Sequence, residues 1–294
     1  MGSFISEYIM KFPSALQFHA GDVMDNAVKA FSREHIVGLR MLRGTIISGV
    51  GAIRSILSYT PWILLVVLVA LLAWRLTKKW FVGAFYAAML TFIGVCGMWE
   101  QMIDTLSIVI AGVVICMILG FPIGILLAVN ARANKIIRPV LDTMQTMPSW
   151  VYLVPAVILF SVGTTPALIA TIIYAVVPMV RMTSHGLLHV DSEMIEASYA
   201  FGATRIQTLF KIQIPQAIPT IMAGVNQTIM MAMSMVVTCA LIGANGLGME
   251  ILIATNRVEM GKALFPGICI VILAIILDRL TQASVKTNEA PLDG

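Results

Sequence analysis

Charged residues are scarce in this chain of 294 residues. Aspartate, glutamate, lysine and arginine together make up 12% of it, whereas hydrophobic residues make up 59%. A soluble domain carries about 25% charged residues, so this chain cannot cover itself with a water-compatible surface. The net charge of +4 is small and scattered, which gives no indication of a nucleic-acid partner. The composition therefore predicts an all-α protein that crosses a membrane several times.

Sequence patterns for catalysis and metal binding are also missing. There is no G-x-x-x-x-G-K-[ST] phosphate loop, so the chain itself is not expected to bind or hydrolyse ATP. The four cysteines lie in apolar stretches without metal-ligand spacing, and they are predicted to be small buried residues. His185 and His189 are four residues apart without a third ligand, which favours surface residues over a metal site. We predict no catalytic residue, metal or cofactor, and an intramembrane protease or lipid transferase is disfavoured.

Seven apolar stretches approach the length that a membrane-spanning helix needs, about 20 residues. The chain before Thr60 is expected to be too polar to span, and no cleaved signal peptide is indicated at its start. The predicted spans are Thr60–Leu76, Trp80–Met98, Leu106–Val129, Met147–Val162, Pro166–Val180, Thr220–Ile242 and Leu264–Ala283.

Basic residues predict how these spans are oriented. They follow the first, third and fifth spans, whereas the loops after the second and fourth spans have none. The positive-inside bias then places the N-terminus outside, the C-terminus inside and the loop 190–217 in the cytoplasm. The tail 1–59 opposes this bias because it carries several basic residues, although long tails translocate largely regardless of charge. Its apolar residues recur at helical spacing, which predicts an amphipathic helix in the membrane interface, with a solvated helix as the alternative.

The loop 190–217 carries signals for two short helices separated by a glycine. Asp191 is a good N-cap, and Gly202 suits a left-handed C′ position. Thr204 and Gln207 match a T-x-x-Q capping box that restarts the helix. Pro215 is expected to end the second helix or to leave it irregular. One side of each helix is predicted to group these residues: Met194, Ala197, Ser198 and Phe201 on the first, and Ile206, Leu209 and Phe210 on the second.

The same loop contains a recognisable motif. Glu196-Ala197-Ser198 is followed by Gly202 and by Ile212-Gln213-Ile214-Pro215. This order and spacing resemble the EAA loop of ABC-importer permeases, E-A-A-x3-G-x9-I-x-L-P, with serine at the third position and isoleucine before the proline. The resemblance implies that the loop couples the permease to a cytoplasmic ATPase; an ordinary amphipathic helix is the alternative. The implied coupling residues are Glu196, Ala197, Ser198, Gly202, Ile212 and Pro215.

The resemblance extends from about Trp62 through most of the chain. The segments 139–155, 219–228 and 275–282 are similar to the glycine betaine/proline betaine/choline branch of these permeases. The similarity implies a type I importer (MetI-like) architecture in the bacterial cytoplasmic membrane. It also implies a permease homodimer, an ATP-binding cassette ATPase subunit and an extracytoplasmic substrate-binding protein. ATP would be bound by the separate ATPase chain, and the chain would divide into a tail 1–59, a permease domain 60–283 and a cytoplasmic tail 284–294.

Polar residues inside the spans are candidates for the substrate path. Asn226, Gln227 and Thr228 lie consecutively in the sixth span, where unpaired polar groups are costly. Hydrogen bonds between helices are an equal alternative for them. Tyr152 could offer an aromatic face to a quaternary ammonium group. Gly120 and Gly124 form a G-x-x-x-G pair that predicts close helix packing.

The function expected from the resemblance is ATP-driven import of a quaternary amine such as glycine betaine, proline betaine or choline. An amino acid such as histidine or proline is the alternative cargo, and an osmolyte channel is a more remote alternative. The substrate rests on the resemblance alone.

Overall fold

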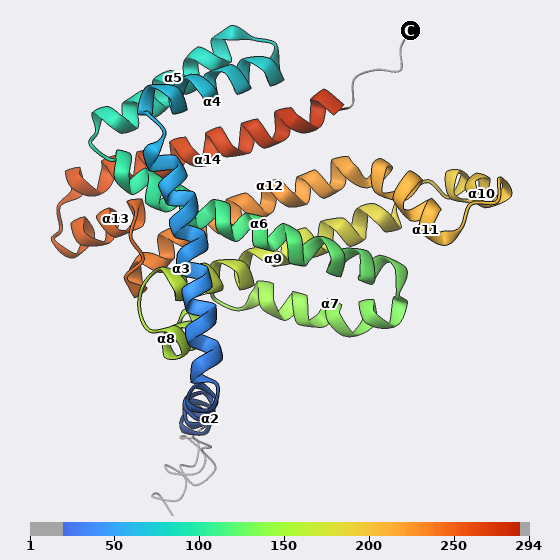
Figure 1. Cartoon of the computed structure of the whole chain (residues 1–294), viewed down its shortest axis with the longest axis horizontal. Coiled ribbons are helices and arrows are strands. Elements are labelled where there is room, and N and C mark those ends of the chain that lie inside the picture. Colours follow the sequence, from blue (N-terminus) through green and yellow to red (C-terminus); the bar gives the residue numbers. More distant parts are fainter. Residues whose placement is uncertain (1–19, 289–294) are drawn as a thin grey trace, which may run out of the picture.

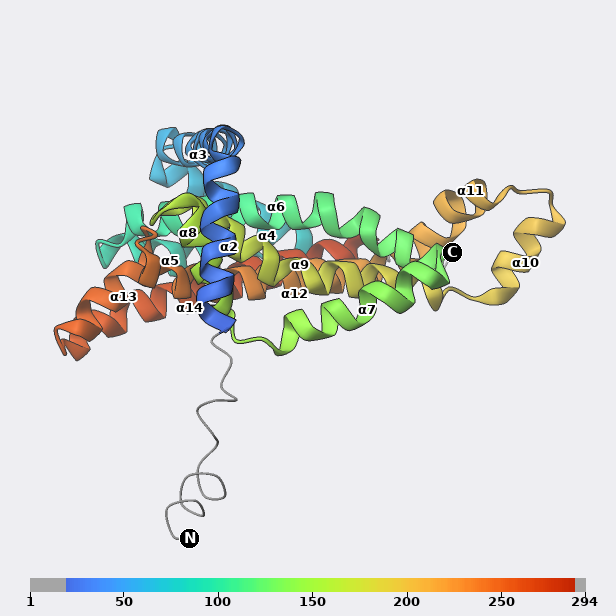
Figure 2. The same ribbon diagram turned by 90° about the horizontal axis from the view of Figure 1, so that it is seen from below.

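Four long helices form the centre of the molecule. In the computed structural model, which describes residues 20–288, every regular element is a helix. The helices α6 (Trp99–Val129), α9 (Thr164–Leu188), α12 (Ile214–Thr238) and α14 (Met260–Asn288) run along the long axis in both views (Figures 1 and 2). The helix α9 packs against both α6 and α12. Each of these helices is long and apolar enough to cross a membrane. The helices α6, α9 and α14 each contain a predicted span, and the predicted span Thr220–Ile242 runs from α12 into the 3-10 turn η4 (Cys239–Ile242).

Glycine lets α6 approach α9 closely. A Cβ atom built on Gly124 would lie 2.5 Å from the Cβ of Thr183 and 2.8 Å from the carbonyl oxygen of Val180. A Cβ on Gly120 would lie 2.8 Å from the Cγ of Met179. The close packing predicted from the G-x-x-x-G pair is therefore confirmed.

The predicted fourth span is not a continuous helix. The chain forms α7 (Ala131–Thr146), a 3-10 turn η2 (Ser149–Tyr152) and the short α8 (Leu153–Phe160), with a bend of 108° between the two parts. Pro148 explains the break, because the residue before a proline avoids the helical region, and Met147 is extended with ψ 135°. The predicted span Met147–Val162 begins at this break and contains only η2 and the eight-residue α8, so it is not one continuous spanning helix; α7 and η2–α8 form a bent pair that can count as a single broken span.

The helices α4 (Trp62–Thr77) and α5 (Trp80–Val95) form an antiparallel hairpin beside α14 (Figure 1). They lie where the first two spans were predicted, but they are shorter than the helices that can cross a membrane by length alone. Each has 16 residues, or about 24 Å at 1.5 Å per residue, which is less than the roughly 30 Å hydrocarbon core. A further short helix, α13 (Leu247–Asn256), lies between α12 and α14 and was not predicted. The expected all-α architecture of about seven apolar helices is thus confirmed in outline.

The N-terminal helices α2 (Ala20–Glu34) and α3 (Ile36–Tyr59) lie across the long axis of the bundle (Figures 1 and 2). By length and composition alone, α3 is apolar enough to cross a membrane, contrary to the expectation for the chain before Thr60. The reason is that its charged residues are only Arg40, Arg43 and Arg54. Residues 1–19 of the predicted tail, and 289–294 of the predicted C-terminal tail, lie outside the described residues.

Candidate functional site

The loop 190–217 lies at one end of the bundle. Its helices α10 (Ser192–Ala200) and α11 (Arg205–Thr208) are followed by a π-helical turn, η3 (Leu209–Gln213), that leads into α12. Both views place α10 and α11 beyond the ends of the long helices, at the end away from α8 and α13 (Figures 1 and 2). The element is therefore attached to α9 on one side and to α12 on the other.

The caps predicted from the sequence are present. The side chain of Asp191 accepts a hydrogen bond from the backbone N–H of Glu193 at 2.9 Å. Gly202 has φ +80°, and its N–H donates to the carbonyl of Tyr199 at 2.9 Å. Thr204 and Gln207 form the reciprocal capping box, at 2.8 and 3.3 Å. The predicted helix–glycine–helix shape is confirmed.

A pair of hydroxyl groups joins the two helices of the loop. The oxygens of Ser198 on α10 and Thr208 on α11 are 2.9 Å apart, and both side chains are buried. One of the two hydroxyls donates to the other, and the accepting hydroxyl uses its own proton for a backbone carbonyl, that of Ile195 for Ser198 or that of Thr204 for Thr208. Ser198 is therefore buried inside the loop, whereas Met194, Ala197 and Phe201, which were predicted to share one side of the helix with it, are exposed. The partner on α11 is the reason, because sequence spacing within α10 does not reveal it.

This contact predicts a modest effect for the Ser198→Ala substitution. A buried hydrogen bond between neutral groups contributes about 0.5–1.5 kcal/mol. We expect Ser198→Ala and Thr208→Ala each to lower the thermal stability of the purified chain, and the double variant to lower it by less than the sum. A double-mutant cycle on melting temperatures measures this coupling. Additive losses would show that the two hydroxyls do not stabilise each other.

The outer surface of the loop is apolar, although nothing within residues 20–288 covers it. Met194 is 46% exposed, Phe201 92%, Ile206 70% and Phe210 60%. Glu196 and Ala197 are exposed as well. Large exposed apolar side chains gathered on one protruding element are typical of a surface that binds another protein.

The junction between the loop and α12 is irregular without being broken. Ile212 is partly buried in η3, and the backbone N–H of Ile214 donates to the carbonyl of Leu209, five residues earlier. Pro215 has no N–H to donate, and it sits in the first turn of α12, where none is required. Of the two outcomes expected for Pro215, the irregular helix is the one observed. The sequence analysis did not identify the π turn.

The three polar residues of the sixth span point in different directions. Asn226 donates from Nδ2 to Oδ1 of Asp278 on α14 at 2.6 Å, and Gln282 donates to the same oxygen at 2.8 Å. Thr228 is fully buried, and its hydroxyl has no hydrogen-bond partner among the described residues. Gln227 is exposed and lines a cavity. Asn226 therefore matches the alternative of a hydrogen bond between helices.

The cavity beside Gln227 has a volume of about 420 Å³ and is lined mainly by α7 and α9, with Gln227 as the one lining residue from α12. Its wall is basic, with Arg138, Arg181, His185 and His189 among the lining residues. Arg181 donates to Asp142 at 2.6 Å and to Gln145, which connects α9 to α7. The two histidines stack with their ring centroids 4.0 Å apart, and no cluster of metal-ligating residues occurs within residues 20–288. They are exposed, as predicted.

Sequence reasoning missed this cavity. Asp142 and Gln145 are three residues apart and face the same way on a helix, but their partner Arg181 is remote in sequence. Tyr152 does not join Gln227 there. Its hydroxyl donates to the carbonyl of Met144 at 2.6 Å, and its ring lies 6.4 Å from that of Tyr174.

Because Gln227 and Thr228 point in different directions, substitutions at the two positions are expected to have different effects. We expect Gln227→Leu to change the KM for transport several-fold, since it alters the wall of a cavity. We expect Thr228→Val to leave transport unchanged and stability equal or slightly higher, because an isosteric methyl replaces a buried hydroxyl without a partner. Uptake in proteoliposomes measures both. An unchanged KM for Gln227→Leu, or a strong transport defect in Thr228→Val, would contradict this division of roles.

A bundle of helices apolar enough to cross a membrane, with an exposed apolar loop at one end, places the chain in the class of membrane proteins with several spans. Residues 120–287 match the family described as "Binding-protein-dependent transport system inner membrane component". The chain belongs to this family.

Two curated relatives and one solved structure are similar to most of this chain. It is 50% identical, over 220 residues, to the glycine betaine/proline betaine transport system permease protein ProW of Salmonella typhimurium, covering 74% of this chain and 61% of ProW. It is 43% identical, over 233 residues, to the glycine betaine transport system permease protein OpuAB of Bacillus subtilis, covering 79% and 82%. An inward-facing structure of the MetNI methionine ABC transporter superposes with a TM-score of 0.57 at 22% identity, covering 63% of this chain and 93% of that one. The last likeness shows the fold and confirms the MetI-like architecture. The chain spans about 61% of the length of the ProW relative.

Proposed function

We propose that this chain is the permease subunit of an ATP-driven importer that moves a small quaternary amine across the bacterial cytoplasmic membrane. The observation that carries the proposal is the protruding element 190–217 with its exposed apolar surface. It is joined directly to α9 and α12, so a push on it is transmitted to helices in the centre of the bundle. The chain itself is not an enzyme in this proposal.

The expected partners follow from what the sequence lacks. The sequence has no phosphate loop, so ATP would be bound and hydrolysed by a separate ATP-binding cassette subunit that docks on the loop. Two copies of the permease would enclose the path, two ATPase subunits would bind the loops, and an extracytoplasmic binding protein would deliver the substrate. Closure of the ATPases would open the path outward, and ATP hydrolysis would return it inward.

The orientation in the membrane is part of the proposal. The basic residues after α4, after α6 and around the loop favour a cytoplasmic position for the loop end of the bundle. The N-terminus would then be outside and the C-terminus in the cytoplasm. The helix α3 would lie along the outer interface, because it crosses the axis of the long helices (Figure 1).

The relatives named for glycine betaine and proline betaine support a quaternary amine as cargo. The decisive experiment is uptake by proteoliposomes that contain the permease, its ATPase and its binding protein. We expect accumulation of glycine betaine only with internal ATP and binding protein. Uptake of histidine or proline in its place would establish the amino-acid alternative. Flux through the permease alone, without ATP, would establish a channel and overturn the importer.

A further inference from the structure

A second cavity, of about 510 Å³, lies at the far end of the α4–α5 hairpin from its Lys78 turn. Four helices meet there, because α3 ends, α4 begins, α5 ends and α6 begins around it. The volume is within the range of about 300–1,000 Å³ that is typical of small-molecule sites. It is lined by Ser58, Thr60, Pro61, Trp62, Thr91, Gly94, Val95 and Trp99.

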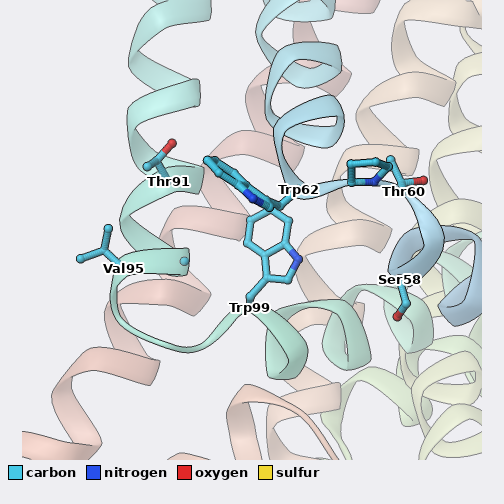
Figure 3. Close-up of a pocket in the computed structure, with 8 residues that line it drawn as sticks. Ser58, Thr60, Trp62, Thr91, Val95 and Trp99 are labelled. Atoms are coloured by element: carbon cyan, nitrogen blue, oxygen red, sulfur yellow. The ribbon is translucent and has the colours of Figure 1, made fainter.

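Two indole rings dominate this cavity. Trp62 at the start of α4 and Trp99 at the start of α6 both reach into the space between the helix ends (Figure 3). Trp62 is 54% exposed, so the cavity is accessible from outside the protein. Trp99 is partly buried and lies over Gly94, where an added Cβ would come 3.7 Å from the indole carbon Cε3. The faces of two tryptophans from different helices attract a cation within about 6 Å of a ring centroid.

The charge around the cavity also favours a cation. The helices α3 and α5 both end here, and neither has a basic residue in its last turn. A helix C-terminus carries about half a negative charge and an N-terminus about half a positive charge, so the two helices that end here and the two that begin here, α4 and α6, offset each other. No lysine or arginine is among the lining residues. Beside Trp99, the carboxylates of Glu100 and Asp104 face the single guanidinium of Arg54, which leaves negative charge in excess.

The hydroxyl groups of the lining agree with this charge. Those of Thr60 and Thr91 each donate at 2.8 Å to a carbonyl of their own helix, Ile56 and Ala87 respectively. With the proton used in this way, each oxygen presents lone pairs to its surroundings. A ligand here would meet aromatic faces and acceptor oxygens, which is the environment of an organic cation that has no N–H to donate.

We propose that this cavity binds a quaternary ammonium group, separately from the substrate path. The group can come from a free solute such as choline or from the choline headgroup of a lipid. The site does not depend on the proposed import function, because it is defined by the permease alone. Tryptophans that only anchor the helices at the membrane interface are the competing explanation, and the experiment below distinguishes the two.

Equilibrium dialysis of the detergent-purified permease with radiolabelled choline tests the site. The uncharged isostere 3,3-dimethyl-1-butanol is the competitor, since it matches choline in shape but has no charge. We expect choline to bind saturably and the isostere to compete at least about tenfold more weakly, the ratio expected from a cation–π contribution. Equal competition by the isostere would overturn the proposal.

Matched tryptophan variants identify the residues. We expect Trp62→Leu to weaken choline binding by about tenfold and Trp62→Phe to restore most of it, because an aromatic face remains. Trp80→Leu is the control: Trp80 is 61% exposed, as accessible as Trp62, but it lies at the opposite end of α5. Glu100→Gln is expected to weaken binding without touching the aromatic rings. If Trp62→Leu binds choline as well as Trp80→Leu does, the cavity is not the site.

Lipid composition distinguishes the two sources of the ammonium group. The same dialysis in nanodiscs of phosphatidylcholine and of phosphatidylglycerol compares a membrane that has choline headgroups with one that lacks them. If choline binds more weakly in phosphatidylcholine than in phosphatidylglycerol, and Trp62→Leu removes this difference, lipid headgroups occupy the cavity. Equal binding in both would show that it takes a free solute. Absence of saturable choline binding in both membranes would overturn the proposal. None of these measurements uses ATP or a partner, so their failure leaves the uptake experiment unaffected.

Discussion

Replacing Gly202 with valine is expected to abolish substrate-stimulated ATP hydrolysis by the reconstituted complex while leaving the permease folded in the membrane. Gly202 has φ +80°, in the left-handed region, and no atom lies within 4 Å of the position of an added Cβ. The effect is therefore one of backbone conformation, and a β-branched residue there costs about 1–2 kcal/mol or more. The chain would relieve this strain by changing the angle between α10 and α11, which would turn Phe201 and Ile206 away from a docked ATPase.

The control is the same substitution at Gly267 in α14. No atom lies within 4 Å of that Cβ position either, but its φ is outside the left-handed range. We expect Gly267→Val to retain stimulation close to that of the unchanged chain. ATPase rates with and without binding protein and substrate measure coupling, and size-exclusion chromatography measures folding. Normal stimulation in a folded Gly202→Val variant would refute the coupling role of the loop.

Replacing Gly124 with valine is expected to have the largest effect on folding. The added Cβ would lie 2.5 Å from the Cβ of Thr183 and 2.8 Å from the carbonyl oxygen of Val180. Overpacking a core costs about 1–3 kcal/mol, and here one of the obstructing atoms belongs to the backbone and cannot rotate away. We expect α6 and α9 to separate and the yield of folded permease to collapse, as measured by fluorescence-detected size-exclusion chromatography and by melting temperature.

A second substitution tests this explanation. Thr183 is buried, and its hydroxyl has no hydrogen-bond partner among the described residues, so Thr183→Ala alone is expected to be mild. Combined with Gly124→Ala, it removes the Cγ2 contact at 2.8 Å and should restore part of the lost stability. No recovery in the double variant would mean that the contact with Cγ2 of Thr183 does not contribute to the lost stability, because alanine at position 183 keeps the Cβ.

Local signals in the sequence predicted local structure well. Asp191, Gly202 and the pair Thr204–Gln207 each act within four residues, and each cap is present as the spacing indicated. The same holds for the close approach at Gly124, since a small residue on an apolar helix constrains what can pack there. Composition and periodicity also sufficed for an all-helical membrane protein.

Features that depend on distant residues were not predictable in this way. Asn226 finds its partner at Asp278, 52 residues later, and no local pattern indicates that the two face each other. The basic cavity depends on Arg181 meeting Asp142 across two helices. The 108° bend at Pro148 was missed because the polar helix α7 that precedes it has too few apolar residues to be identified as part of a span. The unpredicted cavity at Trp62 and Trp99 likewise needs four helix ends to converge.

The π-helical turn Leu209–Gln213 sets the direction, around the axis of α12, in which the loop points. A turn closed by hydrogen bonds to the fifth residue holds one residue more than an α-helical turn, and each residue of an α-helix advances the chain by about 100° around the axis. Deleting one residue from this turn would let α11 and α12 run as a regular helix, but it would swing the exposed Phe201 about 100° around it. The extra residue thus determines how the exposed surface of the loop is rotated relative to the bundle, and hence relative to a partner that docks there.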